Sequence, residues 1–107
     1  YQIINYFGDN PKEYSIFMTI TVLYGFFTKL LKLHFSKDKS KSNIATVLGV
    51  NPFFVNDYLE AARNYSWTAC MDCIAVLREF DLKAKGYNSS DIPEKELYKE
   101  MLLKLSC

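Results

Sequence analysis

Apolar residues recur at intervals of three and four along most of this chain, with polar residues between them. This spacing gathers apolar side chains on one face of a helix. The expected helices occupy residues 11–35, 43–49, 51–65, 67–85 and 93–105, after the end of an earlier helix at residues 3–7. No segment competes with the alternating pattern of a half-buried strand. We therefore predict an all-α fold, a single compact bundle of about six helices formed by residues 1–107 as one domain.

Start and stop signals set the expected helix boundaries. Asn10–Pro11 and Asn51–Pro52 each combine a capping side chain with a residue suited to the first helical position. Further predicted signals are Ser42 or Asn43 and Ser66 at helix starts, and Gly8, Gly49 and Gly86 at helix ends. The core-facing positions expected in the last helices are Val55, Tyr58, Ala62 and Tyr65, then Leu97, Met101, Leu102 and Leu105.

The segment from Ile16 to Phe27 is apolar nearly all round. Such a helix is either central to a core or covered by a partner. The apolar stretch is shorter than the roughly 20 residues of a membrane span, so we expect a buried helix and no membrane contact. Thr21, Gly25 and Thr28 share one face of it, and this small-residue face predicts the close approach of another helix.

Composition narrows the function classes. The 107 residues include 13 basic and 12 acidic side chains, and 16% are aromatic. A net charge of +1 excludes a strongly basic nucleic-acid sleeve and a polybasic membrane patch. No signal peptide is evident, so we expect a reducing cytoplasm and free thiols. Because the chain starts with Tyr1 within an apolar pattern, we expect it to be a C-terminal fragment of a longer protein.

The residues that could carry chemistry are few. Cys70 and Cys73 form a C-x-x-C pair, but both lie on an apolar stripe with Ile74 and Leu77, as buried packing residues do. His34 is the single histidine, with no nearby acid to orient it. The glycines are too far apart to cradle a phosphate. We predict no enzyme activity, no catalytic residue, no cofactor and no metal, and leave open any role of the cysteines, Cys107 included, beyond packing.

The segment from Asn43 to Val55 has the spacing of a helix-turn-helix. Ala45 is small enough for two helices to cross, Gly49 supplies the turn, and Val55 locks the second helix. The outward face of the second helix would present Asp57 and Glu60 and no base. Because phosphate contacts supply most of the affinity of DNA-binding modules, we expect a packing unit of helix-turn-helix type, and DNA reading stays an alternative.

Two features are candidates for contacts with a partner. Asp81 lies on the apolar stripe of its helix, with Arg78 three residues before it and Lys85 four residues after it. This set predicts either a local ion pair at the helix end or a contact between subunits. Phe53 is a large aromatic residue on a polar helix face, which makes it a second interface candidate.

Several pieces resemble, in order along the chain, the C-terminal domain of delta subunits of the bacterial DNA polymerase III clamp loader. They are Ile3–Phe7 with Asn10–Lys12, Leu23-Tyr24-x-x-Phe27, Leu48–Val50 with Pro52, Asp57-Tyr58, Ala62-Arg63-x-Tyr65, Arg78-x-x-Asp81-x-x-x-Lys85-Gly86 and the helix from Leu97 to Leu105. Each piece is short, and the ordered set is what makes the resemblance specific. The segment between Leu33 and Asn43 fits the family pattern poorly.

The resemblance implies a non-catalytic role in DNA replication. Clamp loaders are pentamers of AAA+-related subunits, and their C-terminal helical domains pack into a collar. The resemblance therefore implies an oligomerisation domain that contacts the gamma/tau and delta-prime subunits. Contact with the sliding clamp would belong to an N-terminal domain outside this chain, and DNA contact would be at most indirect. A generic helical adaptor is the remaining alternative, and the sequence leaves open which surface meets which neighbour and whether the chain alone is monomeric.

Overall fold

The computed structural model describes residues 15–86 and 92–106, and these residues form helices and no strand. The elements are α2 (Ile16–Phe35), α3 (Lys41–Leu48), the 3-10 turn η1 (Pro52–Phe54), α4 (Val55–Asn64), α5 (Trp67–Ala84) and α6 (Glu94–Ser106). The predicted all-α class is confirmed for this part of the chain. The helix expected at residues 3–7 and the cap expected at Asn10–Pro11 lie outside the described residues.

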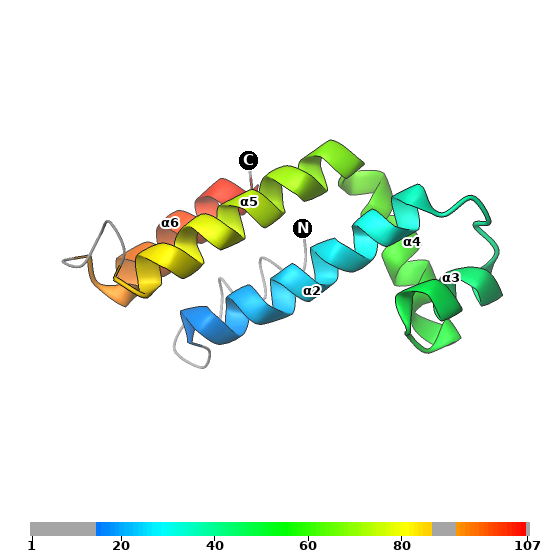
Figure 1. Cartoon of the computed structure of the whole chain (residues 1–107), viewed down its shortest axis with the longest axis horizontal. Helices are drawn as coiled ribbons and strands as arrows, with labels where there is room; N and C mark the ends of the chain where they lie inside the picture. The colour runs from blue at the N-terminus through cyan, green and yellow to red at the C-terminus, as the bar shows by residue number, and fades with distance from the viewer. Residues whose placement is uncertain (1–14, 87–91, 107) are drawn as a thin grey trace.

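The long helices α2 and α5 lie side by side along the molecule, and α6 packs on α5 (Figure 1). Their facing apolar side chains form the main core. Its fully buried members include Leu23, Phe27, Leu77, Phe80 and Met101. The burial of such large side chains is the dominant stabilising contribution to a helical fold of this size.

The start of α2 differs from the prediction. The helix begins at Ile16 and not at Pro11, because Ser15 has an extended backbone and its hydroxyl accepts the N–H of Met18 at 3.1 Å. A serine cap of this kind satisfies one of the free backbone N–H groups at a helix start. The helix continues past the apolar stretch to Phe35, and α2 is long and apolar enough to cross a membrane by length and composition alone. The prediction that this segment is too short for a membrane span is therefore wrong. In the fold, 39% of the most apolar window of α2 is buried.

The predicted close approach at Gly25 is also absent from the described residues. A Cβ atom built on Gly25 would have no neighbouring atom within 4 Å. No helix crossing at Gly25 is therefore present among the described residues.

One buried polar contact joins α2 to α6. The hydroxyls of Thr19 and Tyr98 lie 2.7 Å apart, and both side chains are buried. The sequence pattern predicted Leu97, Met101 and Leu105 as inward positions of α6, which is confirmed, with Leu102 partly buried. Tyr98 was not predicted to be buried, because a period-based assignment places a tyrosine on either side of the apolar stripe equally well.

The shorter elements form a second apolar cluster at one end of the molecule. Ile44, Ala45 and Leu48 of α3 pack with Val55 of α4 and Leu33 of α2. Tyr58 and Ala62 touch this cluster and the main core, so the two are continuous. Ala61, and not Ala62, is the fully buried alanine of α4.

The loop between α2 and α3 is an ordered cap, although the sequence predicts only a polar connection. The ammonium group of Lys39 donates to the backbone carbonyl oxygens of Leu33, His34 (3.2 Å) and Ser36 (2.6 Å), which satisfies the free carbonyl end of α2. The helix α3 then starts at Lys41 with Ser40 at the cap position, earlier than the predicted Ser42 or Asn43.

The predicted helix ends are confirmed where glycine supplies a left-handed backbone. Gly49 has φ 67° directly after α3, and Gly86 has φ 94° shortly after α5. Side chains strain at such angles and glycine does not, which explains why both helices end there. Ser66 caps α5 as predicted, its hydroxyl accepting the N–H of Ala69 at 3.2 Å.

Candidate protein-interaction surface

Phe53 is the most exposed large apolar side chain among the described residues, at 81%. It lies on η1, where Asn51 accepts its backbone N–H at 2.8 Å and so fixes the turn. Its ring meets the edge of Phe54 with centroids 5.4 Å apart, and Val47 of α3 is also exposed. The helix predicted to start at Pro52 thus begins as a 3-10 turn that leads into α4. This 3-10 turn places Phe53 on the surface. An aromatic side chain held in solvent by a fixed backbone is a ready anchor for a partner.

The predicted Arg78–Asp81–Lys85 set is only partly brought together. Lys85 Nζ lies 2.9 Å from Asp81 Oδ2, an i,i+4 ion pair at the end of α5. Arg78 is exposed and makes no ion pair with the described residues. Asp81 was expected on the apolar stripe of its helix. It is half-buried, because it lies at the edge of the face of α5 that packs on the core. The local ion pair is therefore present, and Arg78 stays free to meet a partner.

A stronger ionic cluster joins α5 to α6, and the sequence analysis missed it. Glu79 Oε2 accepts Lys83 at 2.9 Å and Lys104 at 3.1 Å, and Lys83 also lies 3.9 Å from Glu100. Hydrogen bonds from Lys83 and then Lys104 lower the pKa of Glu79, and the bond to Glu79 raises the pKa of Lys83. The i,i+4 spacing of Glu79 and Lys83 was a visible signal, but the third partner, from another helix, was not.

The two cysteines are packing residues, as predicted. Both thiols are buried and unpaired, and burial raises the pKa of Cys70 and of Cys73 to about 11. A thiol that stays protonated at neutral pH is a poor nucleophile and a poor metal ligand. No group of three or more His, Cys, Asp or Glu side chains within residues 15–86 and 92–106 could hold a metal ion.

His34 ties two elements together. Its Nε2 lies 2.6 Å from the backbone oxygen of Tyr65, which joins the end of α2 to the junction of α4 and α5. The interaction gives the single histidine a structural role, and among the described residues no carboxylate is hydrogen-bonded to its ring.

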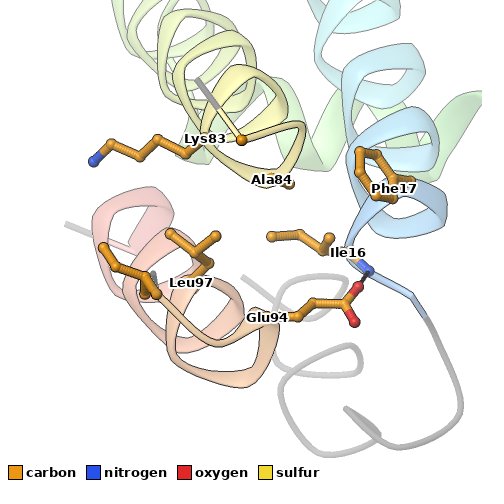
Figure 2. A pocket seen from close by; sticks show the side chains of 8 residues that line it. Ile16, Phe17, Lys83, Ala84, Glu94 and Leu97 are labelled. Atoms are coloured by element: carbon orange, nitrogen blue, oxygen red, sulfur yellow. Dashed lines mark hydrogen bonds between the residues drawn. The ribbon is translucent and has the colours of Figure 1, made fainter. Parts of the chain in front are cut away.

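A small pocket of about 250 Å³ lies where α2 begins, α5 ends and α6 begins (Figure 2). Glu94 accepts the backbone N–H of Ile16 at 3.2 Å, so its carboxylate closes the start of α2. Leu97 and Ala84 contribute apolar walls, and the ammonium group of Lys83 points away from Glu94 (Figure 2). Among the described residues, the pocket offers one carboxylate, which is already hydrogen-bonded, and no second polar group that faces it.

No protein-family model, curated protein or solved structure matches this chain.

Proposed function

We propose that this chain is a non-catalytic oligomerisation domain, the helical collar domain of a clamp-loader delta subunit acting in the bacterial cytoplasm. The observation that carries the proposal is the amount of apolar side chain left in solvent. Thirteen large hydrophobic side chains among the described residues are at least 40% exposed, Phe53 most of all. A chain with near-zero net charge and so much exposed apolar surface is suited to burying that surface against other proteins.

The ordered resemblance described above supports the choice of family. In this proposal the domain packs beside the helical domains of gamma/tau and delta-prime subunits, and opening of the sliding clamp is left to an N-terminal domain outside this chain. The proposal includes a bundle of about six helices. It assigns the chain no catalysis and no cofactor.

We further propose that residues 41–64 act as a packing unit of helix-turn-helix type. Ala45 and Val55 are buried in one cluster, and Gly49 has the left-handed backbone of a tight turn. This arrangement supports the unit, but its chemistry disfavours DNA reading. Asp57 and Glu60 are exposed on α4, and Arg63 in the last turn is the one basic side chain of that helix. Two carboxylates facing a polyanion weaken binding.

The test is a pull-down of the full-length protein that contains this chain from its own cells, with partners identified by mass spectrometry. The proposal predicts recovery of gamma/tau, delta-prime and the sliding clamp. Recovery of none of them by a well-folded protein contradicts it and favours the generic adaptor. Salt-sensitive, sequence-dependent binding of a DNA duplex by the chain would instead favour the DNA-binding alternative.

Two variants address the interface candidates within that assay. Phe53→Ser and Arg78→Ala both alter exposed side chains, so neither is expected to unfold the domain. Ala75→Ser, at another exposed position of α5, is the matched control. Loss of partners with the first two and not with the control assigns these residues to the interface, and full recovery with both removes them from it.

A further inference from the structure

Two aromatic side chains touch each other on the surface where α2 ends and α5 begins, at the same end of the molecule (Figure 1). Phe35 is 66% exposed and Trp67 is 49% exposed, and their ring centroids lie 5.9 Å apart. Met71, one turn after Trp67 on α5, is 52% exposed. We call these three residues the Phe35–Trp67 patch. It lies about 28 Å along α2 from Ile16, at 1.5 Å per residue. Single exposed apolar side chains are common, but an aromatic pair continued by a third side chain is a surface that a partner can cover.

The backbone on both sides of the patch is held by contacts between elements. His34 Nε2 lies 2.6 Å from the backbone oxygen of Tyr65, which ties the residue before Phe35 to the junction before Trp67. The ammonium group of Lys39 donates to carbonyl oxygens at the end of α2. The two rings are therefore presented together by an ordered backbone, so little conformational freedom is lost when a partner covers them.

Positive charge is concentrated beside the patch. Five of the 13 basic residues, but only one of the 12 acidic residues, lie within residues 29–41. Lys32 lies one turn before Phe35 and Lys37 two residues after it, and both are exposed. The one acidic residue, Asp38, already accepts a backbone N–H within the loop at 2.9 Å. The first turn of α5 contains no acidic residue either, so the positive end of its backbone dipole adds to the charge of the lysines.

The lysines of residues 29–41 make no ion pair with any described residue. The lysines that are paired with carboxylates in the described part of the chain lie at the far end of α5 or on α6. The charge beside the patch is therefore uncompensated within this fold. A positive surface around an apolar centre is complementary to a partner that carries negative charge and an apolar side chain.

Both nucleic acids and acidic peptides carry the required charge, and the shape of the patch favours the peptide. A nucleic-acid base stacks flat on an aromatic ring. The planes of Phe35 and Trp67 are tilted by 51°, so a base that stacks on one ring does not stack on the other. Met71 adds a flexible thioether side chain and no ring, and such a side chain adapts to irregular apolar partners. An apolar peptide side chain is therefore the better match to this surface.

We propose that the Phe35–Trp67 patch, with Lys32 and Lys37 beside it, binds an acidic peptide segment of another protein. An aromatic or long aliphatic side chain of the peptide lies against the two rings, and its carboxylates lie beside the lysines. The contact is small, so the binding is weak and depends on salt. The patch shares no residue with the interface candidates described above, and this inference goes beyond the proposed function and does not rest on it.

Trp67 is the single tryptophan of the chain, so its fluorescence reports on the patch directly. The probe is a synthetic peptide in which glutamates flank one phenylalanine and one leucine, added to the whole chain at low ionic strength. The peptide is expected to shift the emission of Trp67 to shorter wavelength, because it excludes water from the ring. Two control peptides are expected to bind at least tenfold more weakly. One has lysines in place of the glutamates, and the other has alanines in place of the two apolar residues.

Two variants of the chain remove the two parts of the site. Phe35→Ser removes the more exposed ring, and Lys32→Glu/Lys37→Glu reverses two charges. Each is expected to raise the dissociation constant of the acidic peptide at least tenfold while the domain stays folded, because the altered side chains are exposed. Lys95→Glu/Lys99→Glu, at two exposed positions of α6, is the matched control for the change of charge and leaves binding unchanged.

No change in the emission of Trp67 at millimolar concentrations of the acidic peptide overturns the inference. Binding that neither Phe35→Ser nor Lys32→Glu/Lys37→Glu weakens also overturns it, because the peptide must then bind elsewhere. A single-stranded oligothymidylate that binds more tightly than the acidic peptide overturns the choice of partner and assigns the patch to nucleic acid.

Discussion

The hydroxyl pair of Thr19 and Tyr98 gives the sharpest test of how α2 and α6 are held together. The two oxygens lie 2.7 Å apart, and Thr19 is fully buried. A buried hydroxyl that loses its partner costs about 1–3 kcal/mol. Thr19→Val is expected to cost this amount, because the Tyr98 hydroxyl keeps no partner in the contact. Tyr98→Phe is expected to cost about 1 kcal/mol, since the Thr19 hydroxyl can turn to a backbone carbonyl of its own helix, as those of Thr21 and Thr28 do.

Urea unfolding followed by circular dichroism measures these changes, and the double variant completes the cycle. Removal of both hydroxyls leaves neither unsatisfied, so the double variant is expected to be less destabilised than the sum of the single ones by about 1 kcal/mol. Thr46→Val on α3 is the control, because the exposed Thr46 hydroxyl bonds only within its own helix, and it should change stability by less than about 0.5 kcal/mol. Strict additivity of the two single changes would refute the contact between α2 and α6.

Three further predictions follow from the core and from the ionic contacts. Leu77→Ala removes a fully buried side chain and should lower the free energy of unfolding by about 2–5 kcal/mol; a loss below about 1 kcal/mol contradicts its burial. Glu79→Ala should lower the free energy of unfolding by about 0.5–1 kcal/mol, and Asp81→Ala should lower it by less. The reason is that Glu79 joins two helices through two lysines, whereas Asp81 has one exposed partner. The opposite order in urea unfolding contradicts this ranking. The pKa of Cys70 and of Cys73 in the folded protein lies near 11, above that of an unfolded thiol. The contribution of the two thiols to stability should therefore be constant below pH 9 and fall as the pH rises through 11. A Cys70→Ala/Cys73→Ala variant should show a smaller fall in melting temperature over that range.

Local signals in the sequence predicted the helical elements well. The serine before Trp67 and the glycines at 49 and 86 each act within one turn of the chain, so their effect is visible without the fold. The exposed position of Phe53 was also predictable, since it is an aromatic residue among polar ones on its helix face. The start of α2 was missed because Ser15, which caps it, was not recognised as a capping residue.

Contacts between distant elements could not be read from the pattern. The reach of Lys39 to the end of α2 depends on how its loop folds back, and the second partner of Glu79, Lys104, lies 25 residues further along the chain on another helix. Gly25 shows the opposite error. Its small neighbours predicted a helix crossing within the fold, but the described helices leave that side of α2 open. The periodicity of a sequence predicts which side chains share one face of a helix. Which element covers that face depends on the arrangement of the helices in the fold.

The central claim is that this chain acts by holding protein subunits together. Native mass spectrometry of the full-length protein mixed with purified gamma/tau and delta-prime subunits from the same cells tests it most directly. The proposed function predicts one complex of five subunits that contains this protein and that fails to form when residues 1–107 are deleted. A five-subunit complex that assembles equally well without these residues, or no complex at all with the intact protein, would contradict the account.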